Sequence, residues 1–395
     1  MIGVKTKVII TDLQTRDLFE HERLFQSLTP EVVNSNLNAA LLYDSNTKEA
    51  SIVMKDSLAN IQMTLDCSVE EDKDVGIFFE FSKLMYILQN YSEEDLKGLC
   101  IVADYDAVKE TSKFNITCAS DKLSLPHMVM TDAQRDDYLH LDFSLNDEEG
   151  FQWSTLTDSQ KLDFSEGLAN ALNFLDTDEK KNNAVAVYPD KIIANDIKHV
   201  FLWKFNSQIL LPLEKIPIHK KIARIASSLM HSGLLNAFVV NSSSALLSTS
   251  KATCRMNNAV SNIAPPSTDD LARISAESVG LEMDASTLYQ TSKFFSGFYS
   301  TNTMNPLKVL FDPENLTFIL QDSGLADFGS CNIERKVKAS SSFEGEVTIV
   351  NNSLICFLGL LDMSNPVSLK IYVAQDKQAV RIVSDRMEIY LARLK

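Results

Sequence analysis

The sequence predicts an α+β fold in which one plan of strands and a helix is repeated along a chain of 395 residues. Two observations lead to this prediction. Joints that are acidic or carry prolines, at 137–150 and 263–273, divide the chain into three blocks of comparable size. Within a block, a strand, a helix and three strands then occur twice, and such self-similarity is typical of repeated domains. The expected domains therefore span 1–145, 146–275 and 276–395.

The third block shows the plan most clearly. GLEMD at 280–284 predicts a strand, and ASTLYQTSKFFSGFY at 285–299 predicts an amphipathic helix. Strands are expected to follow at 306–313, 315–323 and 329–340. The plan then recurs with a strand at 345–350, a helix at 351–363, and strands at 368–375, 379–385 and 387–394. The block is thus two β-α-β-β-β halves.

The other two blocks fit the same plan less clearly. In the middle block we expect helices at 159–175 and 217–230, a strand pair within 183–205 that turns at Pro189-Asp190, and strands at 209–216 and 236–260. In the first block, a strand at 4–12 leads into a helix at 13–28. Because each helix is followed by two or three strands with tight turns, antiparallel sheets with helices on one face are favoured over a parallel α/β sheet.

Composition narrows the classes of function. Acidic residues outnumber basic ones by 16, and a surface of that sign repels nucleic acid and anionic membranes. Any contact with DNA therefore needs a local basic surface. The six cysteines are scattered without a C-x-x-C pair, which argues against a zinc site or disulfides and for a reducing compartment. No apolar run reaches the ~18 residues of a membrane span, so we expect a cytoplasmic protein without a membrane partner.

Motifs of catalysis are missing from the sequence. It contains no G-x-G-x-x-G, no phosphate-binding G-x-x-x-x-G-K-[ST], no H-E-x-x-H and no G-x-S-x-G. Its six histidines are isolated, and its many paired carboxylates are more simply explained as solvated loops. We therefore expect no enzyme activity, no catalytic residues, no metal and no cofactor.

Two short stretches resemble the sliding clamps of DNA polymerases, in particular the bacterial β type. EGEVTIVNNSLICFLGLL with the ending YLARL (390–394) resembles the family's last strand–helix unit and its Met-Pro-Met-Arg-Leu ending. IIANDIKHVF (192–201) resembles the family's Ala-Thr-Asp-Gly-His-Arg-Leu segment. Departures include Ile197 for the glycine, Ala392 for a methionine, and no Phe-Pro-Asp-Tyr in MNNAVSNIAP. They indicate a divergent relative, such as a viral one.

The resemblance implies an architecture and a function. Clamps have three domains per chain, each of two β-α-β-β-β halves, with antiparallel sheets outside and helices lining a ring. Two chains close head to tail as a homodimer around duplex DNA, and the ring serves as a processivity factor for DNA polymerase after a clamp loader has placed it. The alternative function is a scaffold or inhibitor of the clamp fold that binds replication proteins without encircling DNA. Self-association with a central hole separates the two.

The resemblance also implies a pocket for partner peptides, in which the chain's apolar end lies beside the middle-domain segment. Carried over position by position, the pocket consists of Asn195, Ile197, Lys198, His199, Val200, Tyr390, Leu391, Arg393 and Leu394. A few apolar anchors in a desolvated cleft are typical of such binding sites. The simpler interpretation, that 387–394 is only a last core strand, remains open alongside it.

Basic residues on the predicted helices are the candidates for DNA contacts. They are Arg16, Arg23, Lys83, Lys220, Lys221, Arg224 and Lys293. If those helices line a ring, the contacts would go to phosphates, which carry no sequence information. For any single residue an ordinary solvated helix face is the simpler explanation, whereas the cluster HKKIAR at 219–224 favours DNA as a set.

Overall fold

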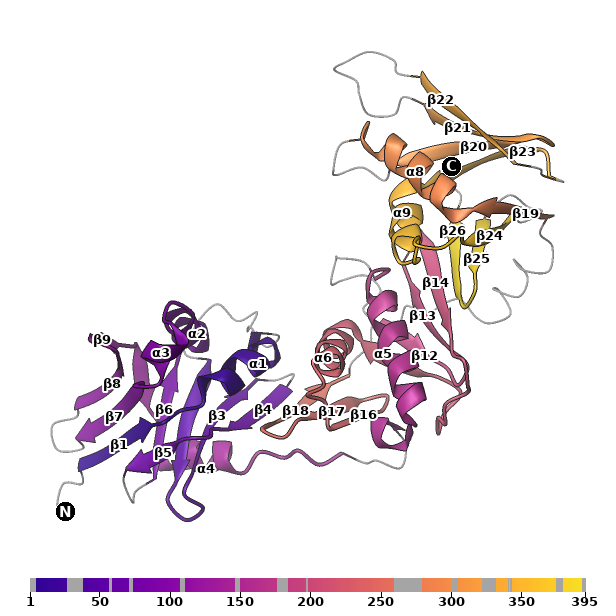
Figure 1. Ribbon diagram of the computed structural model, residues 1–395. Coiled ribbons are helices and arrows are strands. Elements are labelled where there is room, and N and C mark those ends of the chain that lie inside the picture. Colours follow the sequence, from indigo (N-terminus) through magenta and orange to yellow (C-terminus); the bar gives the residue numbers. More distant parts are fainter. Residues whose placement is uncertain are drawn as a thin grey trace. The chain divides into compact units, whose positions relative to one another are not determined.

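The structure is a computed structural model that describes residues 5–26, 38–56, 59–70, 74–106, 111–145, 150–175, 184–196, 198–258, 279–299, 305–321, 332–339, 341, 343–373 and 379–392. The chain forms two compact units, which are visible in Figure 1. Unit 1 contains residues 1–154 and 228–259, and unit 2 contains 155–227 and 260–395. Helix α6 (Lys220–His231) continues from one unit into the other.

The predicted plan of one strand, one helix and three strands occurs six times, and each occurrence is called a half-domain here. Half-domain 1a contains β1 (Lys5–Thr11), α1 (Thr15–Gln26), β2 (Ala39–Asp44), β3 (Glu49–Lys55) and β4 (Ala59–Thr64). Half-domain 1b contains β6 (Val75–Phe79), α2 (Phe81–Gln89), β7 (Cys100–Asp106), β8 (Thr111–Cys118) and β9 (Asp121–Ser124), with the short β5 (Ser68–Glu70) before it and α3 (Glu93–Leu96) within it. The connection to the next half-domain contains β10 (His127–Val129) and α4 (Asp132–Leu139).

The remaining half-domains follow the same order. Half-domain 2a contains β11 (Phe151–Gln152), α5 (Asp158–Leu172), β12 (Ala184–Val187), β13 (Lys191–Asn195) and β14 (His199–Lys204), and 2b contains β15 (Ile216–His219), α6, β16 (Ala237–Val240), β17 (Ser244–Ser248) and β18 (Ala252–Asn257). Half-domain 3a contains β19 (Val279–Asp284), α8 (Ala285–Ser296), β20 (Pro306–Phe311), β21 (Asn315–Gln321) and β22 (Asn332–Lys338). Half-domain 3b contains β23 (Gly345–Val350), α9 (Asn351–Gly359), β24 (Ser368–Val373), β25 (Ala379–Ser384) and β26 (Met387–Ala392).

Local sequence explains where several helices begin. Thr157 caps α5 by accepting from the backbone of Gln160, whose side chain bonds back to the backbone of Thr157. Asp284 caps α8 by accepting from the backbone of Thr287. Such caps satisfy backbone N–H groups that have no partner within the helix.

All strand pairings are antiparallel among the described residues, as the sequence predicts. Unit 1 has a five-stranded sheet, β5-β1-β7-β8-β9, and a nine-stranded sheet that continues from half-domain 1a into 2b through a β4–β18 pair. Unit 2 has an eight-stranded sheet that continues from 2a into 3b through a β14–β26 pair, and the four-stranded sheet β22-β21-β20-β23. Phe25 of α1 stacks on Phe81 of α2 with the ring centres 4.5 Å apart.

Some predicted elements differ from the structure. The run 209–216 is a loop rather than a strand, β15 begins only at Ile216, and the helix predicted from 217 begins at Lys220. The predicted strand pair in 183–205 is three strands, because a second turn lies between β13 and β14. The sequence did not predict β11 or α4. The domain limits 1–145, 146–275 and 276–395 stay a prediction.

Candidate functional site

The apolar end of the chain is held in a sheet. Strand β26 pairs with β14, placing Leu391 opposite His199 and Tyr390 opposite Val200. The backbone N–H of Ala392 also donates to the carbonyl of Lys198 at 2.9 Å. The structure therefore brings together the two segments that the resemblance placed side by side. Ile197, Arg393 and Leu394 lie outside the described residues.

Strand alternation divides the predicted pocket residues between two faces of the sheet. Asn195 is opposite Val200, and Val200 is opposite Tyr390, so these three side chains form a row on one face. This face is called the outer face here, because α5 and α9 pack against the other one. His199 and Leu391 point to the helix side, and Leu391 is fully buried. Within the first row, Val200 is half-buried, and Asn195 and Tyr390 are only 8% and 5% exposed.

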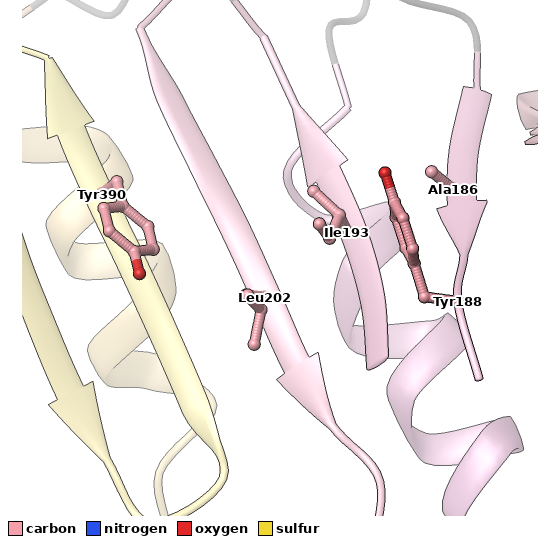
Figure 2. Close-up of a cluster of buried hydrophobic side chains, with 5 residues drawn as sticks. All are labelled: Ala186, Tyr188, Ile193, Leu202 and Tyr390. Carbon is pink, nitrogen blue, oxygen red and sulfur yellow. The ribbon is translucent and has the colours of Figure 1, made fainter. Parts of the chain in front are cut away.

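The outer face is apolar around this row. Figure 2 shows Ala186, Tyr188, Ile193, Leu202 and Tyr390 as one buried cluster on β12, β13, β14 and β26, with the partly buried Val200 packed against it. The family resemblance does not point to the first four of these residues. The two-residue period of a strand could have predicted two of them. Ile193 and Leu202 lie two residues from Asn195 and Val200 and therefore share their face of the sheet.

His199 is held by helix-side contacts. Its Nε2 lies 3.0 Å from the carbonyl of Phe174 after α5, and its Nδ1 lies 2.8 Å from the hydroxyl of Ser353 on α9. The ring also packs edge-on against Phe174. Asp196 accepts from the backbone N–H groups of Lys198 and His199 and so closes the turn between β13 and β14. His199 therefore connects half-domains 2a and 3b.

A buried carboxylate lies beside the outer row on the same face of the sheet. Glu388 of β26 forms ion pairs with Lys204 and with Arg381, whose Nε lies 2.9 Å from its Oε2, and it accepts a hydrogen bond from the hydroxyl of Tyr390. Burial opposes the charge, but hydrogen bonds from Arg381 and Lys204 outweigh it and hold the pKa of Glu388 below its usual value. The position of Tyr390 is thus fixed at both its backbone and its hydroxyl.

The basic residues predicted to contact DNA differ in their availability. Arg16 is paired with Glu20 and Lys83 with Glu80, each within its own helix. Arg23 of α1 is exposed and donates to Ser228 of α6 at 3.0 Å. Lys220, by contrast, is only 3% exposed at the point where β15 runs directly into α6.

Helix α6 has the highest net positive charge of the helices that the structure describes. Its sequence, KKIARIASSLMH, contains no carboxylate. Arg224 is exposed and Lys221 half-buried, whereas Ile222, Ala223 and Ala226 are buried. On α8, the exposed Lys293 lies over the ring of Tyr289 at 4.7 Å.

Comparisons with solved structures identify the fold. The DNA polymerase sliding clamp of Caulobacter crescentus superposes with a TM-score of 0.75 at 12% identity, covering 99% of this chain and 100% of that one. The polymerase III β subunit of Thermotoga maritima gives 0.74 at 10% identity, with the same coverage. A sliding clamp of Bartonella birtlesii, solved bound to griselimycin, gives 0.74 at 11%, again with 99% and 100% coverage.

This chain has the fold of the bacterial β sliding clamps.

Sequence comparisons add nothing to that result, since no family model and no curated protein matches the chain. The clamp fold explains why β14 and β26 pair, and it is consistent with a protein that is not an enzyme. In the parts of the chain that the structure describes, no three His, Cys, Asp or Glu residues gather as a metal site. No described helix is long and apolar enough to cross a membrane.

Proposed function

We propose that this protein is a DNA sliding clamp, a cytoplasmic ring of two chains that encircles duplex DNA and tethers a DNA polymerase. Beyond the clamp fold, the observation that carries the proposal is a rule in how its half-domains join. The last strand of half-domain 1a pairs with the last strand of 2b, and the last strand of 2a pairs with the last strand of 3b. The last strands of 1b and 3a, β9 and β22, are each at the edge of a sheet.

The same rule predicts a head-to-tail homodimer. If β22 of one chain pairs with β9 of another, both of these edge strands are covered, and exposed edges are otherwise prone to unwanted pairing. Two such junctions close two chains into a ring with three domains each, 1–145, 146–275 and 276–395. The twelve helices of the half-domains then line the hole, and the sheets face outwards.

Exposed aromatic side chains support this interface. Phe294 and Phe298 of α8 are 45% and 38% exposed, and Tyr86 of α2 is 70% exposed. The guanidinium of Arg335, on the edge strand β22, lies 5.5 Å from the centre of the Phe294 ring. At the junctions within the chain, the helices of the joined half-domains also meet, as the contact of Arg23 with Ser228 illustrates. At the proposed junction, α8 would meet α2 of the second chain in the same way.

Oligomeric state tests the ring. Light scattering should give twice the 44.1 kDa mass of one chain, and images of the particles should contain a central hole. Replacing Phe294 and Phe298 by Asp should give a monomer with an unchanged circular dichroism spectrum, because both side chains are exposed in the single chain. The matched control replaces Leu210, an exposed leucine on a loop of unit 2, by Asp and should leave the dimer intact. A wild-type monomer at micromolar concentration, on and off DNA, would refute the ring.

Contacts with DNA are proposed for the exposed or half-buried cations Arg16, Arg23, Lys83, Lys221, Arg224 and Lys293. Each phosphate contact adds about −0.9 to the slope of log K against log salt. The Lys221→Glu/Arg224→Glu variant should therefore flatten that slope by about 1.8. The matched control, Lys97→Glu/Lys370→Glu, makes the same change in net charge at exposed positions on α3 and on the outer face. Equal slopes for the two variants would remove α6 from the DNA-binding surface.

Docking of a polymerase peptide is proposed for the outer row of Asn195, Val200 and Tyr390. The apolar cluster under this row and its position at a junction of two half-domains support the assignment. Ile197, Lys198, Arg393 and Leu394 belong to the proposal through the family resemblance. A clamp loader is the second partner expected at this cleft.

A further inference from the structure

The β4–β18 junction of unit 1 repeats the backbone of the proposed peptide cleft. In the β3–β4 turn, the N–H of Asp56 donates to the carbonyl of Ala59 at 2.9 Å, and the N–H of Ala59 donates to Asp56 Oδ1 at 2.7 Å. In the β13–β14 turn, Asp196 and His199 make the same two bonds, at 3.0 and 2.9 Å. Each turn leads into a last strand that pairs with the last strand of a later half-domain.

Strand register identifies the equivalent side chains. Asn60 is opposite Lys55, and Arg255 is opposite Asn60, so these three form a row across the β4–β18 junction. By the same register, Lys55, Asn60 and Arg255 correspond to Asn195, Val200 and Tyr390 of the proposed peptide cleft. The row in unit 1 is therefore polar and basic where the row in unit 2 is partly apolar.

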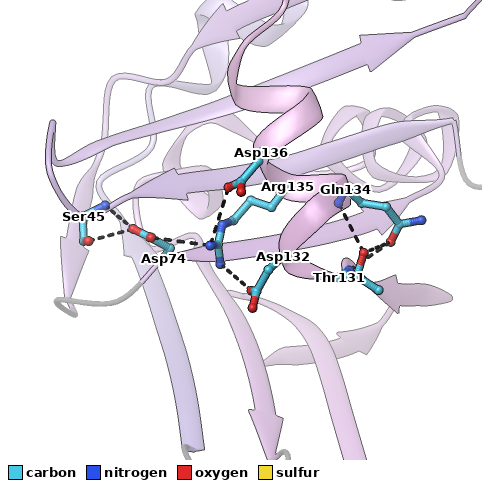
Figure 3. A network of polar contacts seen from close by, with 7 residues as sticks. All are labelled: Ser45, Asp74, Thr131, Asp132, Gln134, Arg135 and Asp136. Carbon is cyan, nitrogen blue, oxygen red and sulfur yellow. Dashed lines mark hydrogen bonds and ion pairs between the residues drawn. The ribbon is translucent and has the colours of Figure 1, made fainter.

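A segment of the chain already lies along this row. Residues 130–142, called the strap here, contain α4 and follow the face of the sheet that carries Ala40, Leu42, Val53 and Phe78. Tyr138, Leu139 and Leu141 pack on that apolar cluster. Figure 3 shows how α4 is attached: Thr131 and Gln134 cap it, and Arg135 bridges Asp74, Asp132 and Asp136.

Carboxylates of the strap contact both cations of the row. Asp137 Oδ2 lies 2.5 Å from Lys55 Nζ. Arg255 Nη1 donates to Asp142 Oδ2 at 2.9 Å and to the Asp142 carbonyl at 3.3 Å. The two aspartates are 62% and 63% exposed, and exposed ion pairs of this kind are weak. A competing acidic segment can therefore displace them.

Beside the strap, the junction contains an open polar hollow of about 380 Å³. Its lining includes Asp56, Asn60, Ser243, Ser244, Arg255 and Asn257. The loop that forms one wall is held by Asn241, which accepts from the backbone of Ser243 and Ser244, and by the buried Asn258, which donates to the carbonyl of Asn241 at 2.6 Å. These hydrogen bonds fix the loop that forms the wall of the hollow. The amide and hydroxyl groups of its lining can form hydrogen bonds with the backbone of a peptide.

We propose that the β4–β18 junction is a second peptide-docking cleft, which takes an extended acidic peptide of a partner protein, and that the strap occupies it in cis until such a peptide displaces Asp137 and Asp142. The basic pair Lys55 and Arg255 selects carboxylates, and the apolar cluster under Tyr138 selects an aromatic or aliphatic residue between them. The inference goes beyond the proposed function and rests on it only for the analogy with the β14–β26 cleft; its test requires neither ring formation nor peptide binding there.

Tethering determines how strongly the strap competes. A short linker holds its own segment at an effective concentration in the millimolar range. A free peptide with an intrinsic Kd of about 100 μM would then bind wild-type protein roughly tenfold more weakly than protein whose strap has been released. Releasing the strap should therefore expose the second cleft.

The test uses the full chain and a fluorescein-labelled peptide with the sequence DDYLHLDFSL, which is residues 136–145. The Asp137→Asn/Asp142→Asn variant should bind this probe more tightly than wild type by fluorescence anisotropy, with a gain that approaches tenfold as the strap is fully released. Adding Arg255→Ala should abolish the gain, whereas adding Lys370→Ala, which removes an exposed cation from the outer face in unit 2, should not. Circular dichroism melting verifies that each variant is folded. Equal affinity of wild type and the Asn variant, or a gain that survives Arg255→Ala, would overturn the proposal.

A second measurement locates the probe without relying on the release of the strap. A photoreactive residue at the position of Leu141 in the probe should cross-link to the cluster of Ala40, Leu42, Val53 and Phe78, on which Leu141 itself packs. Cross-links to 199–204 or 387–392 would place the probe in the β14–β26 cleft and would refute the proposal. An apolar polymerase tail peptide, titrated in parallel, should be insensitive to Arg255→Ala. Its failure to bind would count against the proposed function alone.

Discussion

The environment of Glu388 allows a quantitative prediction about the strand that ends the chain. Glu388 is 1% exposed, and Arg381, which pairs with it, lies between the rings of Tyr372 and Tyr390 at 5.1 and 5.8 Å. Removing one partner of a buried ion pair costs about 3–5 kcal/mol, because the other charge is left uncompensated. Lys204 still reaches Glu388 after Arg381 is lost, so we expect the lower end of that range.

Two single substitutions should therefore have unequal effects. Arg381→Gln leaves a buried carboxylate with one partner and should destabilise unit 2 by about 3 kcal/mol. Glu388→Gln leaves Arg381 and the half-exposed Lys204, which water can solvate in part, and should cost about 1 kcal/mol. For a unit of roughly 200 residues, 1 kcal/mol shifts Tm by about 2–4 °C, so the expected losses are ~6–12 °C and ~2–4 °C.

Calorimetry at several pH values provides the assay. The pKa of Glu388 is lowered in the folded protein, so its stabilising contribution is present above the unfolded pKa and is lost as pH falls through the folded value. In Arg381→Gln the carboxylate of Glu388 keeps only Lys204 as an ion-pair partner and therefore protonates more readily. The difference in Tm between this variant and wild type should narrow as the pH falls from 7 to about 4. The reasoning is wrong if Glu388→Gln is the more damaging change, or if the difference between wild type and Arg381→Gln stays constant across that range.

Three further substitutions test packing, capping and docking. Gly167→Ala should destabilise by about 1–3 kcal/mol in denaturant titrations, because a Cβ there would lie 2.5 Å from Cδ1 of Trp203; an unchanged midpoint would show that the indole moves freely. Thr157→Ala removes the cap of α5 and should cost about 1 kcal/mol by the same measurement, whereas Thr157→Ser should be nearly neutral. Val200→Glu should weaken binding of an apolar polymerase peptide at least tenfold while light scattering still reports a dimer, and undiminished binding would exclude the outer row.

Much of this fold could be predicted from sequence because its helices are short, amphipathic and capped. The helix expected at 285–299 is Ala285–Ser296 in the structure, and it begins directly after its cap, Asp284. The pairing of the chain's end with the 192–201 segment came from a resemblance and not from physical reasoning. Strand alternation predicts which pocket residues share a face of the sheet. It does not predict that His199 faces the helices, because the sequence pattern does not show which face the helices cover.

Other features were missed for identifiable reasons. The strap helix α4 has the sequence DAQRDDYL, whose acidic residues suggested a loop, although Thr131 and Gln134 form a recognisable capping box before it. The run ILLPL suggested a strand, yet Leu210 is 82% exposed and Pro212 cannot donate to a ladder. Lys220 suggested a DNA contact, since sequence alone does not reveal that β15 leads into α6 without a turn.

The internal repeat explains how one chain can hold chemically different sites on one backbone. At β4–β18 and at β14–β26 the sheets are joined by main-chain hydrogen bonds, which do not depend on the side chains of the outer face. Helix-side residues at the two junctions, such as Met256 and Leu391, remain apolar because they belong to a core. At the equivalent outer positions Arg255 pairs with the exposed Asp142, whereas Tyr390 is buried in an apolar cluster, so the same backbone carries unlike side chains. This division is consistent with identities of 10–12% to clamps of the same fold.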